Sequence, residues 1–407
     1  MRAGFGQWEL TPPMGVELAG YGYYLGRCAQ SVRDPLYARA VILEQGDNKV
    51  LVISCDLLGL SKGVCAEVFA HAEKFGIPAE HVIIVSIHTH TGPCIKYHEG
   101  CGYTDDAYVA TVGGLICRAV DAAVADLCDV TGLTQAFRSF EGDHIYNPTI
   151  ADGPVDRYVR GFTLTREGKE PICMINAACH GVFRGRKTAV SADFAGEVNR
   201  LMGEKGCKSI YLNGLCGDID PFKPTDARLC EFAQIVVDAF TAEENPLPLT
   251  MEAGQLPFTL HMTSVTEGEI RGAASHAVEI AGGPDMPAAR VALTWEKEML
   301  AKLSELRDTE DITCKYLILG GVPVLAVPFE GFTQIGIEVR EALGRPDSLM
   351  LGCGEELLGY LPTRDDIARG TYAALESTFL YKRLPVVPGE AERLGQDMGQ
   401  KLKGILA

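Results

Sequence analysis

Four short segments of the chain place histidine or carboxylate side chains directly after apolar runs that are typical of buried strands. The first, Ser86 to Pro93, has the sequence SIHTHTGP and carries His88 and His90. Alternate residues of a strand share one face, so both imidazoles can approach the same ligand. This pattern alone is equally compatible with two polar residues that hydrogen-bond to the backbone at the end of a strand.

The other three segments repeat this arrangement later in the chain. His180 follows the apolar run 172–178, Asp218 and Asp220 close the segment NGLCGDIDP, and Glu330 ends the apolar segment 313–330. Ligands of α/β proteins gather beyond the carboxyl ends of strands, and an unpaired buried carboxylate is costly. Each segment has a structural explanation when taken singly, but their repetition favours a metal site.

We expect these residues to be positioned by an α/β fold with a mixed, largely buried sheet flanked by helices, and the site to lie at the strand C-terminal ends. The runs 49–60 and 81–90 are almost continuously apolar, as in strands buried on both faces. A hairpin is expected with its turn at 167–169, and two strands within 313–330 are expected to join at Gly320 and Gly321. Helices are predicted over 63–75, 107–127, 193–203, 227–241, 292–306 and 388–406.

Composition limits the class of protein. The 407 residues are 47% hydrophobic, enough for a substantial core, and favour one domain over 1–407, with 245–312 as a possible subdomain or insertion. The chain has 54 acidic and 37 basic residues and a net charge of −17, without clustered lysines and arginines. This balance argues against a nucleic-acid partner, which requires a basic surface.

Location and redox state are also predicted from composition. The opening residues lack an apolar signal core, and the longest apolar stretch, 316–329, is interrupted by glycines and prolines. No membrane insertion is therefore expected. The 14 cysteines form no CxxC pair and several lie in apolar runs, so we expect reduced thiols and a cytoplasmic protein.

Taken together, the motifs resemble those of the neutral ceramidases and their shorter bacterial relatives. An ordered set is more specific than any single motif, and this set spans almost the whole chain. The segments that carry the resemblance are TPP (11–13), AGYG (19–22), DPLYARA (34–40), SCD (54–56), HTHTGP (88–93), CHG (179–181), SADFAG (191–196), NGLCGDIDP (213–221), PFEGFT (328–333) and GYLPT (359–363), followed by Tyr372.

The resemblance implies a single zinc ion and a set of residues around it. Two imidazoles, a carboxylate and a phenol suit Zn²⁺, and a catalytic site keeps a position open for water, which the ion activates to attack an amide carbonyl. By the same resemblance, His90 would donate or accept a proton and Tyr372 would stabilise the oxyanion. The implied zinc ligands are His88, His180, Glu330 and Tyr360.

The first departure from the family pattern is Asp220, which stands where ceramidases carry a serine assigned as nucleophile. A carboxylate attacking an amide would form an anhydride, so attack by water is the simpler mechanism. Asp220 is then a candidate general base, or a ligand of a second cation together with Asp218. The remaining interpretation is that it only caps the following loop.

A second departure is the segment DHIYNP at 143–148, which lacks the substrate-contacting arginine of the ceramidase pattern. The nearby pair Arg184 and Arg186 is a candidate for binding an anionic group of the substrate. Solvated surface arginines are the competing interpretation.

A third departure is length, since the chain ends soon after Tyr372 without the C-terminal β-sandwich of full ceramidases. We therefore expect a small, soluble amide substrate rather than membrane ceramide, and a zinc amidohydrolase. An esterase or small peptidase with the same metal site is the second hypothesis. A catalytically silent metal-binding scaffold is the third, which retention of His90 and Tyr372 counts against.

Overall fold

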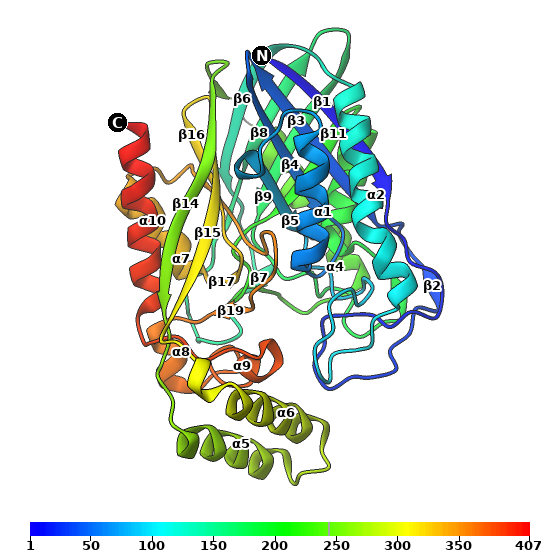
Figure 1. Ribbon diagram of the computed structural model, residues 1–407. Helices are drawn as coiled ribbons and strands as arrows, with labels where there is room; N and C mark the ends of the chain where they lie inside the picture. The colour runs from blue at the N-terminus through cyan, green and yellow to red at the C-terminus, as the bar shows by residue number, and fades with distance from the viewer. Residues whose placement is uncertain (243–244) are drawn as a thin grey trace.

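Two β-sheets packed face to face form the centre of the protein, with helices on both outer surfaces (Figure 1). The computed structural model describes residues 1–242 and 245–407. The mixed α/β fold and the helix-flanked sheet predicted from the sequence are confirmed.

The larger sheet has nine strands in the order β11-β9-β8-β6-β1-β3-β4-β5, with β13 paired to β6. Most neighbours are antiparallel, but β4 with β5 and β9 with β11 are parallel, so the two strands within each of these pairs end at the same edge. The strands are β1 (Arg2–Glu9), β3 (Tyr37–Gln45), β4 (Asn48–Cys55), β5 (Val82–Ser86), β6 (Cys128–Ser139), β8 (Tyr158–Arg166), β9 (Lys169–Ala177), β11 (Lys208–Asn213) and β13 (Asn245–Pro246).

The smaller sheet has four strands in the order β14-β15-β16-β18. They are β14 (Met251–His261), β15 (Thr309–Leu319), β16 (Val322–Ala326) and β18 (Leu349–Leu351). Three two-stranded pairs lie outside both sheets: β2 (Ser31–Val32) with β10 (Ala189–Val190), β7 (Ile145–Tyr146) with β12 (Asp220–Pro221), and β17 (Glu330–Gly331) with β19 (Tyr360–Leu361).

The helices form two groups, one on the larger sheet and one that covers the smaller sheet and extends past the ends of its strands (Figure 1). Those that pack on the larger sheet are α1 (Lys62–Glu73), α2 (Asp106–Ala125), α3 (Asp193–Glu204) and α4 (Asp226–Thr241). Those on the side of the smaller sheet are α5 (Glu267–Ala281), α6 (Pro287–Ala301), α7 (Thr333–Leu343), α8 (Arg364–Arg369), α9 (Glu376–Tyr381) and α10 (Glu390–Leu406). Two short 3₁₀ turns, η1 (Ala79–His81) and η2 (Leu303–Glu305), complete the described elements.

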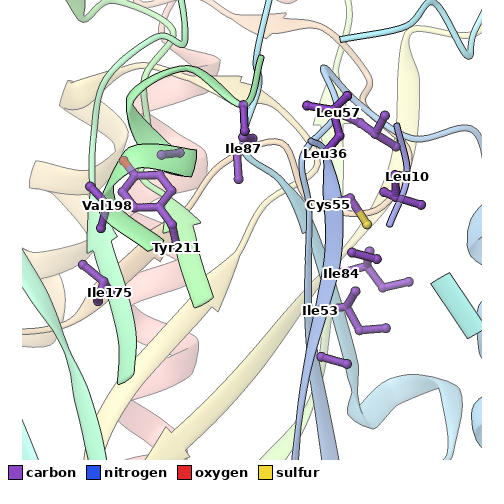
Figure 2. Close-up of a cluster of buried hydrophobic side chains, with 14 of the residues drawn as sticks. Leu10, Leu36, Ile53, Cys55, Leu57, Ile84, Ile87, Ile175, Val198 and Tyr211 are labelled. Atoms are coloured by element: carbon purple, nitrogen blue, oxygen red, sulfur yellow. The ribbon is translucent and has the colours of Figure 1, made fainter. Parts of the chain in front are cut away.

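Strand β4 shows why the sequence of the larger sheet is almost continuously apolar. Leu51 and Ile53 face the helices, where Figure 2 shows Ile53 beside Cys55 and Ile84. Val50 and Val52 face the second sheet, in a cluster that includes strands of both sheets. Because successive residues of a strand point to opposite faces, burial on both faces requires apolar residues at every position.

Helix α2 packs against β1 at a very short distance. A Cβ atom on Gly6 would lie 2.0 Å from the carbonyl oxygen of Ala119, and one on Gly4 would lie 2.1 Å from that of Ala123. Only glycine permits this approach. Among the described helices, α2 alone has the length and hydropathy to cross a membrane, but it lies on β1 and β3 as a core helix does.

Most predicted elements are confirmed with small shifts in their bounds. The hairpin with its turn at 167–169 is β8 and β9, and the two strands joined at Gly320 and Gly321 are β15 and β16. The exposed helix predicted over 292–306 is α6, which begins earlier and buries Trp295 and Met299. Its partner α5 was not predicted.

The segment 262–308 leaves the smaller sheet between two strands that are paired along their whole length. β14 and β15 are antiparallel, and His261 lies opposite Thr309. The helices α5 and α6 between them pack on each other, and α6 also contacts α9. In that contact the ring of Trp295 lies 4.9 Å from Phe379 and its Nε1 donates to the Arg383 carbonyl.

Candidate active site and metal centre

The candidate site lies where strands of both sheets end. His88 and His90 follow β5, His180 follows β9, and Glu330 follows β16. Backbone hydrogen bonds join these ends: His90 N donates to Gly181 O at 3.0 Å, and Ser86 N donates to Cys353 O at 3.1 Å. The strand-end segments selected from the sequence therefore meet in one place.

Three buried imidazoles form the centre of the site. The ring centroids of His88, His90 and His180 are 4.8 to 5.3 Å apart. Their ligand nitrogen atoms lie within 4.8 Å of one another, a spacing that would allow one metal ion to be bound. In the described residues no other group of three such side chains is found.

Backbone carbonyls orient two of these rings. His88 Nδ1 donates to Leu58 O at 2.7 Å, and His180 Nδ1 donates to Cys216 O at 2.6 Å. A ring that donates from Nδ1 presents an unprotonated Nε2 when it is neutral, as a metal ligand must. The Nε2 atom of His88 is buried and faces a carboxylate oxygen of Glu330 at 3.1 Å, so a cation bound between them would satisfy both.

The backbone of His88 is itself strained, with a φ of 62°. A residue with a Cβ atom rarely adopts this left-handed conformation, and it persists only where the surroundings enforce it. Here it turns the chain out of β5 so that His88 reaches the Leu58 carbonyl.

Glu330 completes the cluster. Its Oε2 atom lies 3.1 Å from His88 Nε2 and 3.4 Å from His180 Nε2, and its Oε1 accepts a hydrogen bond of 2.6 Å from Tyr381. Burial raises the pKa of Glu330, but the adjacent His88 and His180 outweigh this and hold it well below its usual range. The carboxylate is thus ionised and fully partnered.

Tyr360 lies next to Glu330 because β17 and β19 pair with these two residues in register. Its ring stacks on His180 at 6.5 Å, and the ring of Tyr372 meets it edge-on at 5.9 Å. Burial, and then the charge of Glu330, raise the pKa of both tyrosines well above the usual value, so both are phenols.

A small cavity of about 50 Å³ opens between these groups. His90 faces it, and both of its ring nitrogens are buried without a hydrogen-bond partner. Burial, and then the neighbouring His88 and His180, lower the pKa of His90 well below its usual value. This imidazole is neutral and free to exchange a proton with a bound molecule.

The two aspartates of the NGLCGDIDP segment have different surroundings. Asp220 is half-buried, and its Oδ1 lies 3.8 Å from His180 Nδ1, beside the cluster. Asp218 points away: its Oδ1 accepts from Thr333 N and Oγ1 at 2.7 and 2.8 Å, and its Oδ2 accepts from Asn147 at 3.0 Å. The partners of both Asp218 oxygens argue against a second cation bound by Asp218 and Asp220. That cation stays a prediction.

The arginines predicted to bind substrate are separated by the fold. Arg184 is buried and its guanidinium forms an ion pair of 2.5 Å with Asp226. Arg186 is exposed and lies over the rings of Tyr24, at 3.6 Å, and Tyr21, at 5.6 Å. The two residues therefore do not act as a pair.

Sequence reasoning missed three residues of this region. Tyr381 binds Glu330, Tyr21 packs edge-on against His90 at 5.0 Å, and the buried Arg27 donates to the His90 carbonyl at 2.8 Å. Tyr21 belongs to the AGYG motif, which marked it without assigning a role. No local pattern distinguished Arg27 or Tyr381.

Comparison with known proteins identifies the fold. No family model matches the sequence, and no curated protein matches it at a significant level. The structure is similar to that of neutral ceramidase from Pseudomonas aeruginosa, with a TM-score of 0.75, 15% identity, and coverage of 99% of this chain and 74% of that one. A ceramidase complexed with C2 gives a TM-score of 0.74, 15% identity, and coverage of 99% and 75%. The resemblance noted in the motifs is confirmed for the fold.

Proposed function

We propose that the chain is a zinc-dependent hydrolase that cleaves the carbon–nitrogen bond of a small soluble amide. The observation that carries the proposal is the meeting of three buried imidazoles with Glu330, whose Oε2 atom faces the Nε2 atoms of both His88 and His180. Imidazole nitrogens and carboxylate oxygens are ligands that Zn²⁺ accepts. The similarity in fold to two proteins named as ceramidases supports hydrolysis as the reaction.

In this proposal the ion is held by two imidazoles, one carboxylate and one phenol. When bound, zinc supplies a Lewis acid and lowers the pKa of a water molecule. Tyr360 is a neutral phenol beside the ionised Glu330, because burial and that charge raise its pKa. Binding of zinc would favour its phenolate. The proposed ligands are His88, His180, Glu330 and Tyr360.

The remaining residues handle protons and charge. His90 is neutral and faces the cavity, so it would accept the proton of the adduct's hydroxyl group and then pass that proton to the leaving amine. Tyr372 is a phenol at the same cavity and would donate a hydrogen bond to the oxyanion. Asp220, beside His180, would accept the proton of the attacking water, which requires no anhydride.

An esterase or small peptidase would use the same residues and differs only in the bond cleaved. A silent scaffold would not need His90, whose ring nitrogens are buried without partners at a cost to stability.

We also propose a cytoplasmic location, which suits the 14 free cysteines.

Elemental analysis of purified protein tests the metal centre. We expect zinc in a one-to-one ratio with the wild-type chain and its loss in His88→Ala. His276→Ala, an exposed histidine on α5, is the control and should keep the metal. An absence of stoichiometric metal in the wild type, or its retention in His88→Ala, would contradict the proposal.

A substrate panel then tests the reaction. N-acyl amines, N-acyl amino acids and esters of the same acyl chain should be compared with the zinc-loaded protein. Faster turnover of amides than of esters supports the amidohydrolase, and turnover of esters alone supports the esterase. If no member of the panel is turned over, the result supports the catalytically silent scaffold.

A further inference from the structure

Arg27 is a buried cation with no carboxylate partner among the described residues. It is 7% exposed, and its Nη atoms donate only to carbonyl oxygens, those of Ala19, His90 and Lys187. Its Nε atom is buried and makes no hydrogen bond. Carbonyl dipoles offset a buried charge only in part, so this guanidinium would be stabilised by an anion nearby.

A tyrosine connects this cation to a second one. The Tyr21 ring lies 5.0 Å from the Arg27 guanidinium and 5.6 Å from that of Arg186, and its other contact is the His90 ring at 5.0 Å. Arg186 is held at 3.6 Å over Tyr24, which limits the conformations of a long side chain. Both cations therefore lie a single aromatic ring away from His90.

The neighbouring basic residues have a carboxylate partner, unlike these two. Arg184 and Lys187 share Asp226, at 2.5 and 2.9 Å. In the described part of the chain, neither Arg27 nor Arg186 forms an ion pair. The chain as a whole carries a net charge of −17, so most of its surface repels anions.

Two carboxylates, Asp193 and Asp220, act on Tyr21 electrostatically, and both have contacts elsewhere. Asp220 lies 3.8 Å from the His180 imidazole. Asp193 accepts from the backbone nitrogens of Arg184 and Phe194, at 3.1 and 2.9 Å. In the described residues neither carboxylate forms an ion pair with Arg27 or Arg186.

We infer that Arg27, Tyr21, Tyr24 and Arg186 form a subsite for an anionic group of the substrate. This inference rests on the proposed function and narrows its substrate class to anionic amides. An N-acyl amino acid has the required form, because its carboxylate is joined through a single carbon to the amide nitrogen that would lie at His90. Arg186 provides the exposed contact, and Arg27 provides a fixed positive charge behind it.

Binding measurements on matched compounds test this subsite. The probes are N-hexanoylglycine, its neutral counterpart N-hexanoylethanolamine, and the O-phosphate of that ethanolamine. Each is titrated calorimetrically into wild-type protein, zinc-loaded and metal-free, and into Arg186→Gln, Arg186→Lys and the control Arg271→Gln, an exposed arginine on α5.

We expect the wild type to bind at least one anion about tenfold or more tighter than the neutral amide. Arg186→Gln should lose most of this preference without changing the affinity for the neutral amide, whereas Arg186→Lys should retain part of it. Arg271→Gln should match the wild type. A larger effect for the phosphate than for the carboxylate supports the subsite and assigns phosphate as its ligand.

Equal binding of charged and neutral probes by the wild type would overturn the inference, as would an unchanged preference in Arg186→Gln. A failure of the subsite can be distinguished from a failure of the proposed hydrolase function. If anions bind preferentially but no probe is hydrolysed, the subsite stands and the hydrolase fails. If the neutral amide is hydrolysed as well as the anions, the hydrolase stands and the subsite fails.

Discussion

The pocket is built from two halves that are held in different ways. The histidine half, His88, His90 and His180, comes from strand ends of the larger sheet. Two of its rings are fixed by backbone carbonyls, those of Leu58 and Cys216. Both carbonyls belong to buried loops that directly follow strands β4 and β11, so these rings are oriented before any ligand arrives.

The tyrosine half consists of Glu330, Tyr360, Tyr372 and Tyr381, all from the chain that follows β16. Backbone pairing of β17 with β19 fixes Glu330 and Tyr360, whereas the other two members are held by contacts between side chains: Tyr381 donates to Glu330, and Tyr372 packs on Tyr360. Tyr372 is 43% exposed, whereas every member of the histidine half is buried. Side chains that hold one another can adjust together when a substrate enters.

The difference suggests a division of work. Each half supplies two of the four proposed zinc ligands. The rigid half should contribute more to metal retention, and the adaptable half should tune zinc affinity and the reaction. The variants below test this division, from the largest expected effect to the smallest.

Replacing His180 by alanine should have the largest effect. It removes a ring of the rigid half and leaves a buried gap, so we expect loss of stoichiometric zinc and no turnover above background. Elemental analysis and an amide assay measure both. If His180→Ala retains as much metal as His276→Ala does, the proposed role of the histidine half in metal retention is wrong.

Asp220→Asn should lower kcat by about a hundredfold to ten-thousandfold, because an amide cannot accept the proton of the attacking water. Zinc should stay bound, since the histidine half is intact. Asp365→Asn, an exposed carboxylate on α8, is the matched control. Unchanged turnover in Asp220→Asn would remove this residue from the mechanism and leave the loop cap as its role.

Tyr372→Phe removes a single hydroxyl from the tyrosine half. Loss of one oxyanion donor typically costs about a hundredfold to a thousandfold in kcat, and we expect an effect in this range with zinc content unchanged. The exposed Tyr103→Phe is the control. A change in KM alone would show that the hydroxyl binds substrate without stabilising the oxyanion.

Tyr381→Phe should have the mildest effect. It takes away the hydrogen bond to Glu330 Oε1 while keeping the ring, so zinc affinity should fall by about tenfold to a hundredfold in a chelator competition. Complete loss of zinc, equal to that of His180→Ala, would show that the two halves contribute equally to metal retention.

The predictability of the site follows the same division. His88, His180 and Glu330 each follow an apolar strand, and the ends of buried strands meet at a sheet edge, so their convergence could be predicted from local sequence. Tyr381 could not be predicted this way. Its position depends on α9, which is placed by contacts with α6 that no local pattern encodes.

Charge pairing could not be predicted either. Arg184 and Arg186 look equivalent in sequence, but the fold gives Arg184 a carboxylate partner and places Arg186 on tyrosine rings. Likewise, the order of strands in the larger sheet depends on pairings between distant segments, such as β1 with β6, and not on hydrophobic periodicity.

The pairing of His261 with Thr309 has a consequence for how proteins of this architecture can diverge. The segment with α5 and α6 begins and ends at two paired residues of β14 and β15. Its length or sequence can therefore change without breaking the hydrogen bonds between these strands. However, Trp295 packs on Phe379 of α9, the helix that ends in Tyr381, and Tyr381 donates to Glu330. Changes in this segment can therefore alter the position of the Glu330 carboxylate. Selection acting on this peripheral insert can therefore alter the reactive centre while every proposed ligand stays the same.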